Sequence, residues 1–213
     1  MAVPGGRRNG ILGDEEEDAA LFEEEGVEFA EEDDIDHSDI PLHLRPLVTA
    51  AESGDFNALR QALDNFDGSI DEPVEDGDTV LHLTCLYGHL SCVQFLLERG
   101  ANLEAKDEDG AIPMHDACAG GYTEVVQILL NSANDPDRVK RMLETVDVEG
   151  DTPLHHAARG EYVNVIRLLL AYGASPTVTN MYGKTPSELT DPGTEARGIL
   201  EEASSTVSVN SNS

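Results

Sequence analysis

The chain has no tryptophan and few aromatic residues, with five Phe and five Tyr among its 213 residues. It is also poor in positive charge: 13 Lys and Arg stand against 43 Asp and Glu, which gives a formal net charge of −30 at pH 7. A negative field of this size repels nucleic-acid phosphates and anionic membranes and attracts basic proteins. We therefore expect no binding to nucleic acid, and favour a protein partner with a basic surface or segment.

Cysteine is scarce as well, and its three copies lack the spacing of a disulfide framework or a zinc site. Cys85 and Cys118 each fall eight residues after a Gly, at equivalent places, which indicates small buried packing residues. Free thiols fit a reducing compartment, so we expect a cytoplasmic protein, with the nucleus as the alternative. No apolar run has the length of a membrane span, and the first residues lack an apolar signal core, so we expect no membrane insertion.

What the chain does contain is a tetrapeptide that recurs at a nearly fixed spacing. Its copies are Thr152-Pro153-Leu154-His155, Thr79-Val80-Leu81-His82, Ile112-Pro113-Met114-His115 and the truncated Thr185-Pro186. A glycine stands two residues before each copy, at Gly77, Gly110, Gly150 and Gly183. These glycines are 33, 40 and 33 residues apart. A period of 33 residues is typical of stacked arrays, in which each unit buries its apolar face on the next.

The unit that begins at Gly150 shows how each copy is expected to fold. Thr152 is a suitable helix N-cap, and Pro153 suits the first helical position. A short first helix follows, and then a second helix with apolar residues at helical spacing. Gly173 ends the second helix, because glycine readily supplies the positive φ of a C-cap.

Two units depart from this pattern. Ala133 stands where the third unit should have its closing glycine, and Glu161 stands where the fourth should have the glycine between its helices. We expect Gly160, one residue before Glu161, to supply that turn.

These features together resemble the ankyrin repeat family, whose signature combines the Thr-Pro-Leu-His segment, a glycine between the helices and a final Gly-Ala. The resemblance implies an all-α repeat solenoid of helix-turn-helix units with β-hairpin fingers. It also implies that His82, His115 and His155 belong to the scaffold. Residues 1–39, where positions 14–39 hold 15 acidic residues and no Lys or Arg, are expected to be a disordered acidic segment.

The ankyrin repeat domain is predicted at residues 40–203, followed by a flexible tail at 204–213. Its units are predicted at about 43–76, 77–109, 110–149, 150–182 and 183–203, of which the first is a capping unit, the third holds an insertion and the last is partial.

Partners of ankyrin arrays usually bind the finger tips and the exposed face of the first helices, so the resemblance implies a candidate binding site. Seven of the nine finger positions are acidic and none is basic. The acidic residues are Glu75, Asp76, Asp78, Glu108, Asp109, Glu149 and Asp151. Leu86 and Tyr87 are the expected apolar anchor, with Tyr182 beside Lys184 as a second. The alternative is that these acids are solvated turn residues of an acidic protein.

The 40-residue interval contains seven extra residues, which lie within 134–143. Pro136 after an Asn-Asp pair predicts a helix start, and three apolar residues then form a short stripe. The positive charges of this insertion are Arg138, Lys140 and Arg141. Two interpretations stay open: a recognition element that projects from the array, or a packing helix whose basic side offsets nearby acid.

No phosphate-binding glycine loop, nucleophile elbow or metal-spaced Cys/His cluster occurs in the sequence, so we expect no catalytic residue, cofactor or metal site. The prediction is a non-catalytic protein–protein interaction module, an adaptor or escort, monomeric, that binds a basic protein segment. The alternative is a regulatory or substrate-recruiting subunit of a phosphatase, kinase or ubiquitin ligase. There is also a weak similarity to small acidic ankyrin proteins that escort ribosomal proteins, although their acidic tail lies at the other end. Whether the acidic head of this chain binds or only solubilises stays open.

Overall fold

The computed structural model describes residues 40–74 and 76–210, and of residues 207–210 only the backbone. The predicted acidic head at 1–39 lies outside the described residues. In the described part the chain is helical and contains no β-strand. Its helices are α1 (Arg45–Ser53), α2 (Phe56–Asp64), α3 (Val80–Leu86), α4 (Leu90–Glu98), α5 (Pro113–Ala119), α6 (Thr123–Ser132), α7 (Pro136–Glu144), α8 (Pro153–Arg159), α9 (Val163–Ala171), the 3₁₀ helix η2 (Pro186–Leu189) and α10 (Glu195–Asn210).

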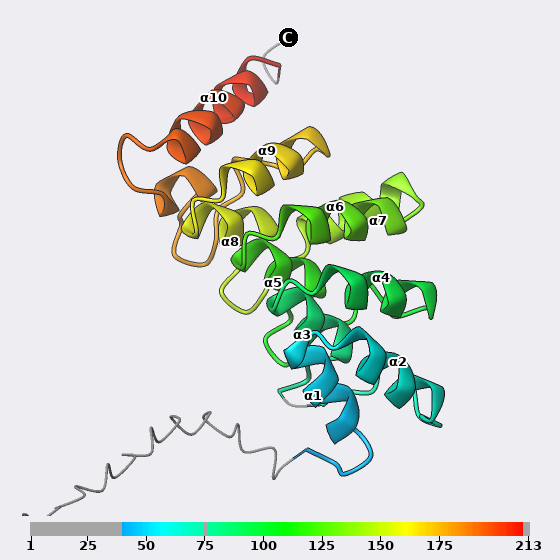
Figure 1. Ribbon diagram of the computed structural model, residues 1–213. Helices are drawn as coiled ribbons and strands as arrows, with labels where there is room; N and C mark the ends of the chain where they lie inside the picture. Colours follow the sequence, from blue (N-terminus) through cyan, green and yellow to red (C-terminus); the bar gives the residue numbers. More distant parts are fainter. Residues whose placement is uncertain (1–39, 75, 211–213) are drawn as a thin grey trace, which may run out of the picture. The chain divides into compact units, whose positions relative to one another are not determined.

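The helices form two rows that follow the order of the chain (Figure 1). One row consists of the first helices of the units, because α1 packs on α3, α3 on α5, α5 on α8 and α8 on η2. The second helices form the other row, from α2 through α4, α6 and α9 to α10. A single apolar core runs between the rows from one end of this part to the other. The predicted all-α repeat architecture is therefore confirmed.

Most first helices begin with the same local structure, in which a histidine closes a capping box. The backbone N–H of the N-cap residue donates to Nδ1 of a histidine three residues later, which satisfies one of the free donors of the helix start. These bonds join Thr79 to His82 (3.0 Å), Ile112 to His115 (3.0 Å) and Thr152 to His155 (3.1 Å). The three histidines are therefore scaffold residues.

Adjacent units interlock where an aromatic ring lies on a glycine of the preceding unit. Gly88 has φ of 72°, in the left-handed region, and a Cβ placed on it would lie 2.4 Å from the ring of Tyr122. The same pairing joins Gly54 to the His89 ring and Gly121 to the Tyr162 ring. At these positions glycine is required both by the backbone angle and by the ring that lies on it.

The two departures from the repeat keep the backbone shape in different ways. Glu161 itself takes the left-handed conformation, with φ of 54°, whereas Gly160 stays helical at −85°, so the prediction for Gly160 is wrong. In the next unit Asp191 lies against Glu161, and its N–H donates to the Glu161 carboxylate (2.7 Å). After α6 the left-handed residue is Asn134, at φ of 53°, and Ala133 remains helical.

The C-terminal end differs from the predicted flexible tail at 204–213, because α10 continues to Asn210. Its hydroxyl side chains donate to carbonyls of the preceding turn, Ser204 to Leu200 (2.8 Å) and Ser205 to Glu201 (2.9 Å). The hydroxyls are thus satisfied within the helix instead of competing with it. Residues 211–213 lie outside the described residues.

Substitution of Gly88 tests the ring-on-glycine contact. We expect Gly88→Ala to lower the free energy of unfolding by about 2–5 kcal/mol, since it combines left-handed backbone strain with a clash against Tyr122. The measurement is the urea unfolding midpoint followed by circular dichroism.

Gly100→Ala is the matched control, because Gly100 has φ of 89° but no atom within 4 Å of the added Cβ. It should cost about 1–2 kcal/mol, the strain alone. Equal losses in the two variants would contradict a role for the ring.

Candidate protein-binding surface

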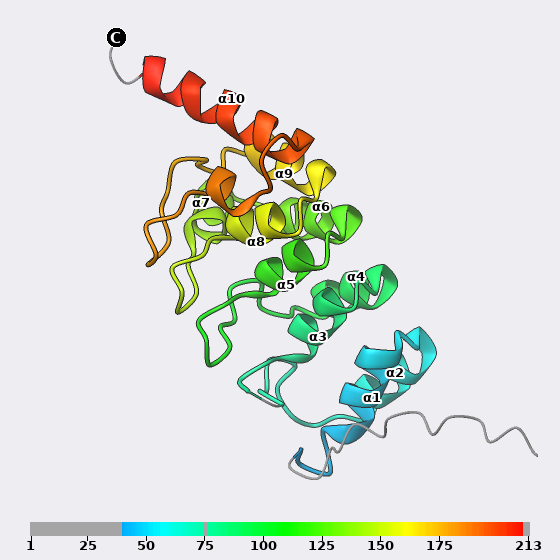
Figure 2. The ribbon, with the colours of Figure 1, turned by 90° about the vertical axis from the view of Figure 1, so that its left-hand side faces the viewer.

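The fingers are hairpin loops that project from one edge of the array beside the first helices (Figure 2). Each is closed by a backbone hydrogen bond, from Val74 to Asp78, from Asp107 to Ala111, from Asp147 to Asp151 and from Asn180 to Lys184. Neighbouring fingers are joined in a constant register, by Glu108 N–H to Asp76 O (3.0 Å), Val148 N–H to Asp109 O (2.7 Å) and Met181 N–H to Glu149 O (2.8 Å). The expected hairpins are present, but single bonds of this kind are too few for the ladder of a strand.

The acidic side chains of the first two described fingers face solvent. Asp76, Glu108 and Asp109 are exposed, and Asp78 is half-buried beside them. Glu75 lies outside the described residues. The shared backbone register places these carboxylates in one row, as the repeat predicted.

The acids of the next finger are neutralised from within the chain. Arg159 of α8 forms ion pairs with both Asp151 and Glu149. Asp151 is fully buried and also accepts a hydrogen bond from the side-chain amide of Asn180 (2.8 Å). Of the predicted finger acids, Asp151 is therefore a structural residue that does not face a partner, and Glu149 already has a positive neighbour.

A second pair of side chains, His156 and Asp147, also joins α8 to this finger. His156 of α8 bonds Asp147 through Nε2 (2.8 Å). Although burial favours the protonated acid, the hydrogen bond from His156 and the backbone N–H groups of Asp151 and Glu149 hold the pKa of Asp147 below its ordinary value. The fourth unit thus supplies its own partners for these finger acids, Arg159 and His156.

The side chains predicted to be apolar anchors are exposed on the surface. Leu86 and Tyr87, at the end of α3, are each 41% exposed. On the later fingers Met181 is 66% exposed, Tyr182 63% and Val148 59%. The early fingers therefore expose acidic side chains, whereas the later fingers expose apolar ones.

Asp116 of α5, which the repeat signature did not point to, belongs to the same surface. Its Oδ2 is buried and accepts no hydrogen bond from the described residues. Burial raises the pKa of Asp116 well above its ordinary value, and the charges of Asp78 and Asp107 raise it further. The sequence signal that could have found it is the comparison of units: Asp116 lies six residues after Gly110, where the fourth unit has His156 six residues after Gly150.

The insertion forms α7, which begins as predicted at Pro136 with Asp135 as its N-cap. The side chain of Asp135 accepts a hydrogen bond from the N–H of Asp137 (3.1 Å). Met142 and Leu143 are buried in the core. The helix therefore packs onto the array, and its apolar stripe holds it there.

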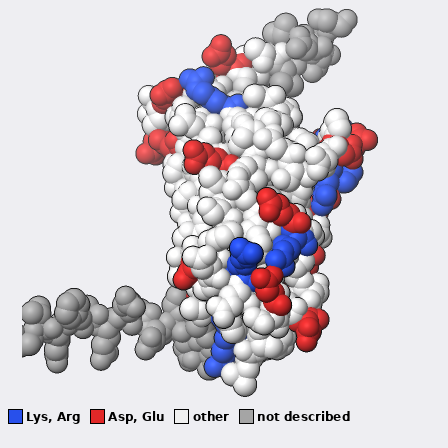
Figure 3. All heavy atoms as spheres, turned by 45° about the vertical axis from the view of Figure 1, so that its right-hand side comes forward, with Lys and Arg blue, Asp and Glu red and all other residues white. Residues whose placement is uncertain are grey.

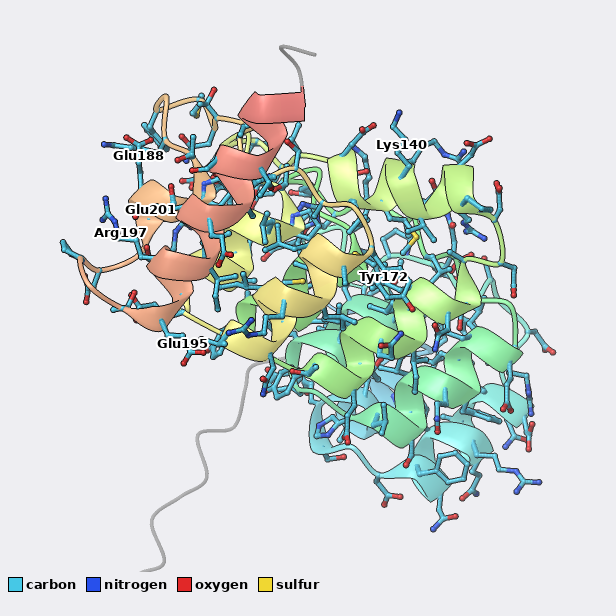
Figure 4. The ribbon with its side chains drawn as sticks, turned by 90° about the horizontal axis from the view of Figure 1, so that it is seen from above. Lys140, Tyr172, Glu188, Glu195, Arg197 and Glu201 are labelled. Carbon is cyan, nitrogen blue, oxygen red and sulfur yellow. The ribbon has the colours of Figure 1, made fainter. Side chains whose placement is uncertain are left out.

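The basic side of α7 is largely occupied. Arg138 and Arg141 both donate to the carboxylate of Glu104 in the preceding unit, at 2.9 and 3.0 Å. Hydrogen bonds from Arg141 and the positive charges hold the pKa of Glu104 below its ordinary value. On the face that Figure 3 shows, positive and negative side chains lie next to one another. Lys140 points away from α7 into solvent (Figure 4) and lies 3.9 Å from Glu144. These contacts favour the packing-helix interpretation.

Two groups of Asp and His side chains lie close enough together to surround a metal ion. They are Asp78, His82 and Asp107, and Asp147, Asp151 and His156. The second group is held by the internal hydrogen bonds described above. In the first, Nδ1 of His82 already accepts the Thr79 N–H, so the neutral ring carries its proton on Nε2 and lacks a free lone pair for a metal. Hydrogen bonding within the chain thus explains the placement of both groups.

The cysteines are packing residues, as predicted. Cys85, Cys92 and Cys118 are buried and free of disulfides. Burial raises the pKa of each thiol, and in Cys85 and Cys118 the charge of Asp116 adds to the effect. None of the three is therefore an activated thiolate.

Asp116→Asn should stabilise the protein in a pH-dependent way. The folded-state pKa of Asp116 is raised, so ionisation of this carboxyl destabilises the folded state as pH rises from the unfolded pKa through the folded one. The amide keeps the shape and cannot ionise. We expect the variant to melt a few degrees above the wild type at neutral pH and at the same temperature near pH 3, by differential scanning calorimetry.

Glu202→Gln, an exposed change of the same kind on α10, should leave the melting temperature unchanged at both pH values. A variant Asp116→Asn that melts below the wild type at neutral pH would contradict the placement of this carboxyl among like charges.

Comparison with known proteins agrees with this architecture. A palmitoyltransferase, AKR1 of Yarrowia lipolytica, is 33% identical over 69 residues, which are 32% of this chain and 10% of that protein. The match covers so small a part of the transferase that it indicates a shared repeat segment only. No helix in the described residues has the combined length and apolarity needed to cross a bilayer. A family model for ankyrin repeats (three copies) matches residues 27–107, 47–140 and 106–180, and the chain belongs to the ankyrin repeat family, whose repeats form protein-binding modules.

Proposed function

We propose that this protein is a non-catalytic adaptor or escort that binds a basic protein segment along its early fingers. The observation that supports the proposal is that the acidic side chains of the early fingers are exposed, whereas those of a later finger are paired with an arginine of the chain. Asp76, Glu108 and Asp109 face solvent at the tips, whereas Asp151 and Glu149 are paired with Arg159 inside the chain. The negative field available to a partner is therefore concentrated on the early fingers.

The apolar side chains give the binding surface a direction. Leu86 and Tyr87 lie at the end of α3, between the two acidic fingers in the chain, and Met181 and Tyr182 occupy the last finger. Acidic residues speed association with a basic partner, and aromatic anchors supply most of the affinity once they are covered. A suitable partner segment is rich in Lys and Arg at one end and apolar at the other.

The cellular setting follows from the same features. Buried free thiols suit a reducing compartment, so the proposal places the protein in the cytoplasm, with access to the nucleus. Lys- and Arg-rich ribosomal proteins and histones are the partner class to test first, with the protein acting as a monomer.

Charge reversal at the early fingers is the direct test. We expect Glu108→Lys with Asp109→Lys to weaken binding of a Lys/Arg-rich ribosomal protein or histone by about tenfold or more, since two attractions become repulsions. Affinities are measured by biolayer interferometry over a salt series, in which wild-type affinity should fall as salt rises.

The control variant carries Glu98→Lys with Glu124→Lys, an equal change of charge on exposed positions of the second helices. It should bind almost as the wild type does. Equal losses of affinity in the two variants, or an affinity that does not change with salt concentration, would contradict the proposed finger site.

A further inference from the structure

The last finger, residues 180–184, ends the row of fingers with a carbonyl group that its neighbours use and it does not (Figure 2). In the earlier fingers, the carbonyl of the residue before the glycine accepts an N–H of the next finger: Asp76 from Glu108, Asp109 from Val148 and Glu149 from Met181. Tyr182, before Gly183, has the equivalent position in the last finger. Among the described residues no group donates to the Tyr182 carbonyl.

The glycine of the last finger is uncovered as well. A Cβ placed on Gly77 or Gly150 would lie only 2.7 or 2.9 Å from a backbone nitrogen of the next finger, and on Gly110 the nearest atom would be 3.8 Å away. These three glycines are half-buried. Gly183 is exposed, and no atom lies within 4 Å of the corresponding Cβ position. The surface that each earlier finger presents to the next one is therefore open at the last finger.

The last finger keeps the shape of the earlier ones although no finger follows it. Gly183 has φ of 69°, close to the 77° to 79° of the three earlier glycines. Oδ1 of Asn180 accepts the N–H groups of Tyr182 and Lys184 (3.0 Å each), and the Asn180 amide donates to Asp151 of the preceding finger (2.8 Å). A surface that is already ordered loses little conformational freedom when a partner binds to it.

The side chains at this end of the row suit an apolar partner segment. Met181 and Tyr182 are the most exposed apolar side chains of the later fingers. Lys184 of the same finger is also exposed, and its charge repels a basic side chain. The Lys- and Arg-rich part of a partner is therefore expected at the early fingers, and its apolar part at the last one.

We propose that an extended apolar segment of the basic partner binds the open finger edge, formed by Met181, Tyr182 and Gly183, in the place of a further finger. A main-chain N–H of that segment donates to the Tyr182 carbonyl, and its backbone lies on Gly183. Partners commonly add a strand to an exposed backbone edge, where main-chain bonds give affinity and side-chain contacts give specificity. The inference rests on the proposed function, and it names the atoms that hold the apolar end of the partner.

A second copy of this chain is the competing occupant, but its charge argues against it. Each chain has a formal net charge of −30, so two copies repel each other. A head-to-tail contact between finger rows would also leave an open edge on each new copy, and would continue into a filament. The partner segment, which carries positive charge, meets neither difficulty.

The first test fills the space above the glycine. A synthetic peptide with a Lys-rich half, a Gly/Ser linker and a half of Val and Thr is made in both orders, and its affinity is measured by fluorescence anisotropy. We expect wild type to bind it about tenfold more tightly than the Lys-rich half alone. Gly183→Ala should lose this gain, because the methyl group keeps an incoming backbone away.

Gly173→Ala is the matched control. Gly173 lies outside the fingers, has φ of 96° and has no atom within 4 Å of the added Cβ, so it carries the same left-handed strain as Gly183→Ala. It should keep the gain in affinity. Circular dichroism should show that both variants remain folded.

The second test leaves the protein unchanged and removes the donors of the peptide. N-methylation of the backbone amides in the Val and Thr half keeps the side chains and abolishes the N–H groups. We expect this peptide to bind wild type no better than the Lys-rich half does. Combining it with Gly183→Ala should cause no further loss, since both changes remove the same contact.

The outcomes separate the inference from the proposed function. If wild type does not bind the Lys-rich half, the proposed function fails and the inference fails with it. If it binds, and Glu108→Lys with Asp109→Lys weakens it, the function stands. The open finger edge is then wrong if the Val and Thr half adds nothing, or adds equally in Gly183→Ala and Gly173→Ala. A gain that survives N-methylation also overturns the main-chain contact.

Sedimentation equilibrium tests the second copy. We expect a monomer at all concentrations at which the peptides are measured. Self-association that Gly183→Ala abolishes and Gly173→Ala does not would assign the open finger edge to another copy of the chain and overturn the proposal.

Discussion

No unit of this chain can bury its apolar face alone, and the other features of the fold depend on that constraint. Each first helix packs on the second helix of its own unit and also on the first helices of the neighbouring units, so neighbouring units must stack in one register. The ring of Tyr122 on Gly88 fixes that register, because it fits only where the glycine leaves space. Once the register is fixed, the fingers come to lie side by side whatever their tips contain. The scaffold therefore sets where a charge is placed, and the finger sequence sets which charge it is.

The repeat signature was sufficient for the architecture, because the residues that carry it also make the local bonds. The capping hydrogen bond between Thr152 and His155 needs only those two residue types at that spacing. The signature was not sufficient at Glu161, which takes the left-handed conformation itself and accepts the N–H of Asp191 from the next unit. That is a contact with the next unit, which a single unit's sequence does not contain. The prediction of a flexible tail was wrong for a different reason: the composition indicated disorder, but the hydroxyl groups of Ser204 and Ser205 donate to backbone carbonyls of the preceding turn in α10.

The candidate site was predicted only in part, for a related reason. The exposure of Glu108 and Asp109 follows from their place at the tip of a finger. The burial and pairing of Asp151 do not follow from its finger position. They depend on Arg159 of the adjacent helix and on Asn180 of the next finger. Asp116 was missed since no signature includes its position. Side-chain pairing with Arg159 of the adjacent helix and with Asn180 of the next finger thus decides that Asp151 is not available to a partner.

The contrast between Asp116 and His156 shows that equivalent positions of two units can differ in charge while the fold stays the same. The side chain of His156 forms a hydrogen bond with the finger acid Asp147 of its own unit. The carboxyl of Asp116 at the same position has a raised pKa because of burial and the charges of Asp78 and Asp107, so its ionisation lowers the stability of the fold. Such a cost is tolerable in a stacked array, because each unit is stabilised by both neighbours and the buried core is continuous through α3, α5 and α8.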